Sequence, residues 1–230
     1  ETVHTSITLA LISGIVMAFV GLLFSRAALE IMSTPDNVID QSALYMRIYF
    51  LGMPFFMLYN YGAAILRAVG DTKRPLLFLI ISGIANAGLN MLLVIVFDMG
   101  VAGVAIGTVV SQFISCVLVL RCLHHSEGSY QLRFSKLTIK SFYLKQIFQV
   151  GVPAGIQSTV INLSNALLQS SVNSFGSTAM AGYTAANNIF GFLYISVNSI
   201  TQSCMSFTSQ NYGVRKKKRM YKILIDCMIL

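Results

Sequence analysis

Long apolar segments are the feature that most constrains how this chain of 230 residues can fold. Seven of them follow one another along the chain, at about 6–24, 48–66, 76–97, 101–120, 147–172, 178–208 and 219 onward. Each complete segment has about 18 or more mainly apolar residues, enough for a helix to cross a hydrocarbon core of about 30 Å. Only 10% of the residues are charged, against about 25% in soluble domains. The sequence therefore predicts an all-α protein, a polytopic membrane helix bundle.

The basic residues indicate which connections share a side of the membrane. Nearly all of the 16 Lys and Arg residues lie in the connections 67–75, 121–146 and 211–222, whereas 98–100 and 173–178 contain none. The positive-inside rule predicts such an alternation for a protein that crosses the membrane many times. We therefore expect a multi-pass protein of the cell inner (plasma) membrane, surrounded by membrane lipids, with its basic loops in the cytoplasm. Topology then explains the net charge of +8, and no nucleic-acid partner is expected.

The two ends of the chain lead us to expect an internal fragment of a longer membrane protein. The chain begins with Glu1 rather than Met and stops within the apolar run 223–230. The entry into the first segment, at 2–7, is similar in character to the entry into the last, at 219–224. A parallel repeat of six helices, as in transporters built from two related halves, gives such a spacing.

Polar side chains recur at helical spacing in the fifth and sixth segments and so share one face of each helix. Interhelical hydrogen bonds are one interpretation of these stripes, and the lining of a polar cavity is the other, which the number of amides favours. In 48–66, Pro54 should kink the helix, and the Met and aromatic residues around it suit either ordinary packing or an adaptable binding wall. The resulting candidates for a substrate cavity are Met53, Phe56, Asn60, Gln157, Asn162, Asn165, Gln169, Asn187, Tyr194, Asn198 and Gln202.

Three residues of the third and fourth segments form a candidate cation site. Asn86 and Asn90 are four residues apart and so point the same way. Thr108 can face them across a short hairpin. Two amides and a hydroxyl can coordinate a cation, or can hold a water beside a proton-binding carboxylate. No complete span carries an acidic residue at its middle.

The chain lacks the constellations on which soluble enzymes depend. No phosphate-binding loop, zinc-protease motif or nucleophile elbow occurs in it. The glycines at 100, 103 and 107 have helical spacing and suit close helix packing rather than phosphate binding. We therefore predict no catalytic residue, no metal site and no enzymatic activity.

Four stretches together resemble the multidrug and toxic compound extrusion (MATE) family of transporters. Residues 66–75 (LRAVGDTKRP) resemble its LRAxGDTxxP signature, and 100–112 (GVAGVAIGTVVSQ) its GVxGxAxATxxSQ motif. Residues 150–158 (VGVPAGIQS) resemble the start of the family's seventh helix, and 210–213 (QNYG) the GQNxGA end of its eighth. The stretches occur in the family's order and spacing, and the match extends over essentially the whole chain.

This resemblance implies part of a twelve-helix, two-lobe transporter. On the family's plan, 1–123 is the amino-terminal lobe (helices 3–6), 124–146 is the cytoplasmic linker between lobes, and 147–230 is the start of the carboxy-terminal lobe (helices 7 to early 9). The implied activity is that of a cation-coupled antiporter, driven by H⁺ or Na⁺, that exports drug-like and often cationic organic compounds by alternating access. It implies no organic cofactor, and we expect the full-length protein to be monomeric.

The resemblance also bears on the cation site. Asn86 and Thr108 match residues of the family's site, Asn90 stands where the family has an Asp, and the Asp of the first helix lies outside the chain. Two alternatives to an exporter remain. One is a lipid-linked oligosaccharide flippase of the same superfamily, against which the scarcity of Arg and Lys within the spans argues. The other is a membrane-embedded enzyme or a passive subunit.

Overall fold

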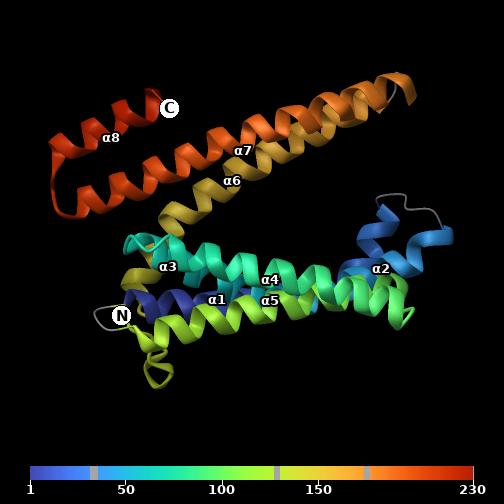
Figure 1. Cartoon of the computed structure of the whole chain (residues 1–230), viewed down its shortest axis with the longest axis horizontal. Helices are drawn as coiled ribbons and strands as arrows, with labels where there is room; N and C mark the ends of the chain where they lie inside the picture. The colour runs from blue at the N-terminus through green and yellow to red at the C-terminus, as the bar shows by residue number, and fades with distance from the viewer. Residues whose placement is uncertain (32–35, 127–129, 174–176, 230) are drawn as a thin grey trace. The chain divides into compact units, whose positions relative to one another are not determined.

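The computed structural model describes residues 1–31, 36–126, 130–173 and 177–229. These residues form helices and no strands (Figure 1), as predicted for an all-α protein. The elements are α1 (Thr2–Ile31), α2 (Asp36–Leu51), α3 (Met53–Ala68), α4 (Lys73–Met91), the π-helical turn η1 (Leu92–Val96), α5 (Gly100–His125), the 3₁₀ turn η2 (Phe134–Lys136), α6 (Ser141–Asn173), α7 (Ser177–Gly213) and α8 (Lys217–Ile229). The chain divides into two compact units, Glu1–Tyr143 and Leu144–Leu230.

The predicted connection between the first two segments is largely helical, which corrects the sequence-based boundary. Helix α1 extends to Ile31, and α2 begins at Asp36. Leu29, Ile39 and Ala43 bury one face of this pair against each other. The charged residues that interrupt the apolar pattern here are exposed and form ion pairs. Arg26 pairs with Glu30 at 3.2 Å and with Asp40 at 3.1 Å.

The predicted kink near Pro54 is present, and it divides the second apolar segment into two helices. Helices α2 and α3 meet at Gly52 with a bend of 45°. Pro54 lies in the first turn of α3, where its missing N–H is tolerated. Gly52 itself donates its N–H to the carbonyl of Tyr49 at 3.0 Å. The bend is therefore a local consequence of the Gly-Met-Pro sequence.

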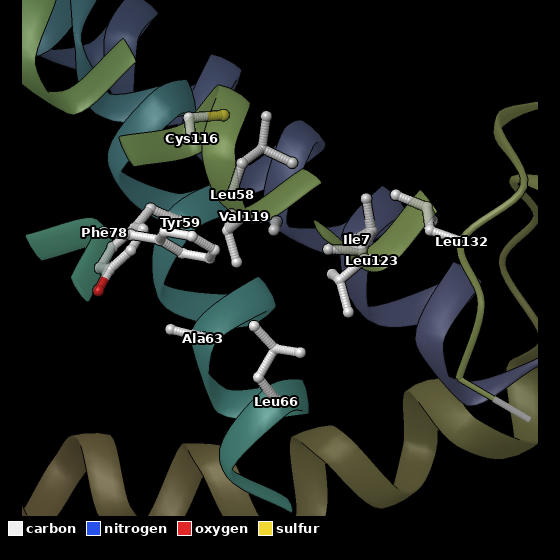
Figure 2. Packing of buried hydrophobic residues seen from close by; sticks show 11 residues of the cluster. Ile7, Leu58, Tyr59, Ala63, Leu66, Phe78, Cys116, Val119, Leu123 and Leu132 are labelled. Atoms are coloured by element: carbon white, nitrogen blue, oxygen red, sulfur yellow. The ribbon is translucent and has the colours of Figure 1, made fainter. Parts of the chain in front are cut away.

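The core of the first unit lies where α1, α3 and α5 pack together (Figure 2). Leu66 on α3 and Leu123 on α5 are fully buried, and so is Leu132 from the segment that follows α5. Leu132 donates its N–H to the carbonyl of Leu123 at 3.0 Å, and the N–H of Lys140 donates to Thr5 Oγ1 at 3.2 Å. Residues in the middle of the predicted interlobe linker thus contact α1 and α5.

Three helical stretches are long and apolar enough to cross a membrane: Thr2–Glu30, Lys73–Val96 and Gly100–His125. The bent pair α2–α3 is a fourth if it counts as one span. Among the described residues, α6 and α7 do not meet this criterion, because polar side chains interrupt their apolar residues. By this criterion, the structure supports the predicted spans of the first unit but not those of the second.

The basic connections of the first unit gather at one end of it. Figure 1 places the start of α1, the turn from α3 to α4 and the end of α5 at that end, and the turn from α4 to α5 at the other. The connection 67–75 and the end of α5, where the basic connection 121–146 begins, are therefore on the same side, while 98–100 is on the opposite side. This is the arrangement that the alternation of charge predicts.

A hydrogen bond ties α3 to the start of α4, and its loss should be measurable. The buried Tyr59 hydroxyl donates to the carbonyl of Pro75 at 3.0 Å. We expect Tyr59→Phe to reduce stability by about 1 kcal/mol, the usual net value of such a bond. Thermal unfolding of the purified full-length protein measures this as a lower Tm. Tyr61→Phe, on the same helix, is the control, and equal Tm values for the two variants would contradict the prediction.

Candidate functional site

A cavity of about 430 Å³ opens between α3, α4 and α5 in the first unit. It lies inside the part of the chain whose helices are apolar enough for a membrane, yet most of its lining residues have polar side chains. Its walls are formed by Phe56, Tyr59, Asn60 and Arg67 of α3, by Leu79, Ser82, Gly83 and Asn86 of α4, and by Thr108, Ser111, Gln112 and Ser115 of α5. Polar side chains within a span usually face such a cavity.

Asn86 and Asn90 come together beside this cavity, whereas Thr108 joins them through its backbone carbonyl, since its hydroxyl donates to the carbonyl of Val104 at 2.9 Å. Asn90 Nδ2 donates to Asn86 Oδ1 at 3.2 Å, and Asn86 Nδ2 donates to Ser111 Oγ at 3.3 Å. The Ser111 hydroxyl donates in turn to the carbonyl of Thr108 at 2.7 Å. The hairpin between α4 and α5 thus produces one continuous polar network from residues that lie far apart in sequence.

The carbonyl oxygen of the Asn90 amide is held in an unusual position. Asn90 Oδ1 is buried and has no hydrogen-bond donor among the described residues. A Cβ atom at Gly107 would lie 2.3 Å from this oxygen, so the glycine leaves the space that the amide occupies. A buried acceptor without a donor costs free energy. The position therefore suits a cation, a proton donor or a water as its missing partner.

Gln112 presents a second buried acceptor of the same kind in the cavity wall. Its Oε1 atom has no hydrogen-bond donor among the described residues. The atom lies against the break between α2 and α3, where a Cβ atom at Gly52 would approach it to 2.6 Å. The buried amide oxygens of Asn90 on α4 and Gln112 on α5 thus each lie against a glycine of a neighbouring helix or helix break.

The charges around the cavity limit the chemistry that it can support. Its lining residues include no carboxylate, and Arg67 is the charged residue among them. Amide and hydroxyl oxygens are ligands that hard cations accept. The arrangement can therefore bind a cation through neutral oxygens, but none of the lining residues described offers a carboxylate that would carry a proton.

A π-helical turn follows the network directly. The carbonyl of Leu92 accepts the N–H of Phe97 at 3.2 Å, a bond that spans five residues. Single π turns of this kind are often found at functional sites, because they re-aim the side chains beside them. Here the turn begins two residues after Asn90 and brings Leu93 close to Gly103, where a Cβ atom would meet Leu93 Cβ at 3.1 Å.

The candidates for the substrate cavity are distributed over both units. Phe56 and Asn60 line the 430 Å³ cavity, whereas Met53 is not among its lining residues. The Asn60 amide donates to the carbonyl of Phe56 at 2.8 Å and is partly satisfied by its own helix. On α6 and α7 the described candidates are exposed: Gln157, Asn162, Asn165, Asn187, Tyr194, Asn198 and Gln202. The side chain of Gln169 lies outside the described residues.

Several polar residues of the cavity were not among the sequence candidates. Ser82 precedes Asn86 by four residues on α4, and Ser111 and Ser115 continue the line that Thr108 begins on α5. Their helical spacing would have identified them, as it identified the amides. Gln112 lies beside this line, and only the packing of α5 against Gly52 shows that its amide oxygen is buried.

Comparisons with known proteins identify the family of the chain. A family model described as MatE matches residues 1–92 and 153–230 of the chain. The chain belongs to the MATE family. This confirms the resemblance that the four sequence stretches carry, and it agrees with the predicted membrane helix bundle.

Curated relatives of this MATE chain are named as multidrug proteins. "Probable multidrug resistance protein YoeA" of Bacillus subtilis is 31% identical over 96% of this chain and 50% of its own length. "Multidrug export protein MepA" of Staphylococcus aureus is 21% identical over 92% of this chain and 47% of its own length. The MATE chain thus spans about half the length of the curated relatives it matches.

Solved structures agree with the fold of the MATE chain. One is described as "Outward-facing conformation of a multidrug resistance MATE family transporter of the MOP superfamily"; it matches with a TM-score of 0.89 at 21% identity and covers 99% of this chain and 51% of that chain. Another, "Crystal structure of MATE in the bent conformation", gives a TM-score of 0.86 at 22% identity over 98% and 51%. These similarities support the helical arrangement that surrounds the cavity.

Proposed function

We propose that the full-length protein is a cation-coupled antiporter, driven by H⁺ or Na⁺, that exports drug-like and often cationic organic compounds by alternating access. It acts as a multi-pass monomer of the inner membrane, with its basic connections in the cytoplasm, and needs no organic cofactor. Membership of the MATE family and the multidrug names of the relatives support the transport of small organic compounds rather than of a lipid-linked oligosaccharide or the activity of an enzyme.

The main support for the proposed cation site is the buried amide oxygen of Asn90. Asn90 Oδ1 is buried with no donor in the described part of the chain, and it lies next to the hydrogen-bonded pair of Asn86 and Ser111. A cation or a hydronium that enters from the cavity supplies the missing partner. Because a ligand shifts a conformational equilibrium only by its differential affinity, binding there favours the conformation in which these oxygens converge.

Coupling follows if the organic substrate binds best to the opposite conformation. The polar stripes of α6 and α7 and the walls formed by Phe56 and Asn60 are the surfaces proposed to contact the substrate. An organic cation is attracted by amide dipoles and aromatic faces without requiring a buried carboxylate. A cavity without carboxylates can also release such a cation readily once the conformation changes.

Replacement of Asn90 by leucine tests the proposal. Leucine branches at Cγ as asparagine does, although it is larger, and it removes both the oxygen and the donor to Asn86. We expect Asn90→Leu to reduce export of ethidium, used as a cationic organic probe, at least about tenfold, the effect of losing one well-placed polar contact of about 1.4 kcal/mol. Proteoliposomes that hold the full-length protein measure this under a Na⁺ gradient and, separately, under a pH gradient.

The control is Gln41→Leu, which removes an exposed amide on α2 outside the cavity. It should export ethidium as the unmodified protein does. Folded yield is compared by size exclusion, so that lost export is not confused with lost protein. Full coupled export by Asn90→Leu would show that Asn90 has no role in the mechanism. Export by the unmodified protein at the same rate with and without the Na⁺ and pH gradients would overturn cation coupling itself.

A further inference from the structure

A second cavity lies at the basic end of the first unit and shares no residue with the first. It has a volume of about 440 Å³ and lies between the start of α4 and the end of α5. Its lining residues are Arg74, Phe78, Leu118, Arg121, Cys122 and His125. Three of them can carry positive charge and two are large and apolar, a combination that the transport of a cation does not explain.

Two of the three groups that can carry positive charge in this cavity, those of Arg74 and His125, make contacts that fix their positions. Arg74 Nε pairs with Asp71 Oδ2 at 3.3 Å, and its Nη1 contacts Cys122 Sγ at 3.6 Å. The Nδ1 atom of His125 donates to the carbonyl of Arg121 at 3.0 Å. Among the described residues, Arg121 has no carboxylate partner. The cavity therefore keeps a net positive charge that an anion can neutralise.

The apolar residues lie one helical turn further along the spans than the basic ones. Phe78 follows Arg74 by four residues on α4, and Leu118 precedes Arg121 by three on α5. Both helices are long and apolar enough to cross a membrane. Beyond Phe78, α4 continues to expose apolar side chains, among them Ile80, Ile81 and Ile84. The charged rim is thus at the membrane interface and the apolar wall extends toward the hydrocarbon core.

We propose that this cavity binds one anionic phospholipid, with its phosphodiester at Arg74, Arg121 and His125 and the upper part of an acyl chain against Phe78 and Leu118. Guanidinium groups match phosphate oxygens in geometry as well as in charge. Basic pockets between transmembrane helices recognise lipid headgroups in this way. A free phosphate uses only the rim, so the apolar wall is the feature that selects a lipid.

Native mass spectrometry of the detergent-solubilised full-length protein tests the site with three probes: dioleoylphosphatidylglycerol, dioleoylphosphatidylcholine and inorganic phosphate. We expect one phosphatidylglycerol molecule to bind more tightly than phosphatidylcholine, and phosphate not to displace it. Arg121→Gln should weaken phosphatidylglycerol binding about fivefold, which corresponds to the ~1 kcal/mol that one Arg contributes beside anionic lipid. Lys73→Gln removes the same charge one residue from Arg74 but outside the lining, and should leave binding unchanged.

Leu118→Trp provides a test that does not alter charge. It fills the apolar part of the cavity, and phosphatidylglycerol binding should fall while the basic rim is intact. Thermal unfolding of each variant confirms that it is folded. Equal losses in Arg121→Gln and Lys73→Gln would assign the binding to diffuse surface charge and overturn the proposal. Displacement by inorganic phosphate, or equal affinity for phosphatidylcholine, would overturn it as well.

Discussion

Gly107→Ala should nearly abolish coupled export while leaving the protein folded. The added Cβ atom would lie 2.3 Å from Asn90 Oδ1, which is closer than two such atoms can approach. The amide is the end of a short flexible side chain, so it can rotate away at small cost. In doing so it gives up its 3.2 Å hydrogen bond to Asn86 and removes its oxygen from the site. One methyl group, placed on the neighbouring helix, therefore has the effect of deleting Asn90.

Ethidium export from proteoliposomes of the full-length protein measures this effect. We expect a loss of about tenfold or more, as for Asn90→Leu, with an unchanged elution profile in size exclusion. Gly88→Ala is the matched control, because a Cβ atom there meets nothing within 4 Å. If Gly107→Ala exports ethidium normally, the position of the Asn90 oxygen is irrelevant to transport.

Gly14→Leu should have the largest effect on folding. Gly14 lies where α1 crosses the start of α3, and even a Cβ atom there would be 2.5 Å from Pro54 Cα and 3.2 Å from the carbonyl oxygen of Met53. Both atoms belong to the backbone and cannot rotate aside. Overpacking of a fitted interface costs about 1–3 kcal/mol even when side chains can adjust. Here α1 and α3 must separate, so most of the protein should fail to fold.

Folded yield after expression and the Tm in detergent measure this result for the full-length protein. Gly88→Leu introduces the same side chain at a glycine that has open space around it, and it should fold normally. A Gly14→Leu protein with normal yield and Tm would show that the helices do not approach closely at this crossing.

The sequence predicted the elements whose pattern depends on local physics. Apolar length identified the spans, and the alternation of Lys and Arg predicted that the α3–α4 turn and the end of α5 share one end. The neighbourhood of Asn86, Asn90 and Thr108 was predictable because a short hairpin joins their helices. In contrast, most of α2 was not predicted as a helix, because its exposed charged residues interrupt the apolar pattern of its buried face.

Contacts between distant residues could not be predicted from one sequence. The spacing of Gly107 indicates close packing, but only the structure shows that the atom it accommodates is Asn90 Oδ1. Similarly, Gln112 is an ordinary amide in sequence, and its burial depends on the bend at Gly52. The stripes on α6 and α7 stay a prediction, because exposure within one unit is compatible with either of their interpretations.

The absence of carboxylates from the lining residues of the 430 Å³ cavity has a consequence for how the protein responds to pH. Of its lining residues, only Arg67 and Tyr59 are ionisable, and neither side chain type normally changes charge between about pH 5 and 8. The electrostatic potential that these residues create is therefore constant over the range of pH that a cell meets. If protons drive export, the group that binds them lies outside this lining. Its protonation then affects the cavity by changing the conformation of the protein rather than the charge of the lining residues.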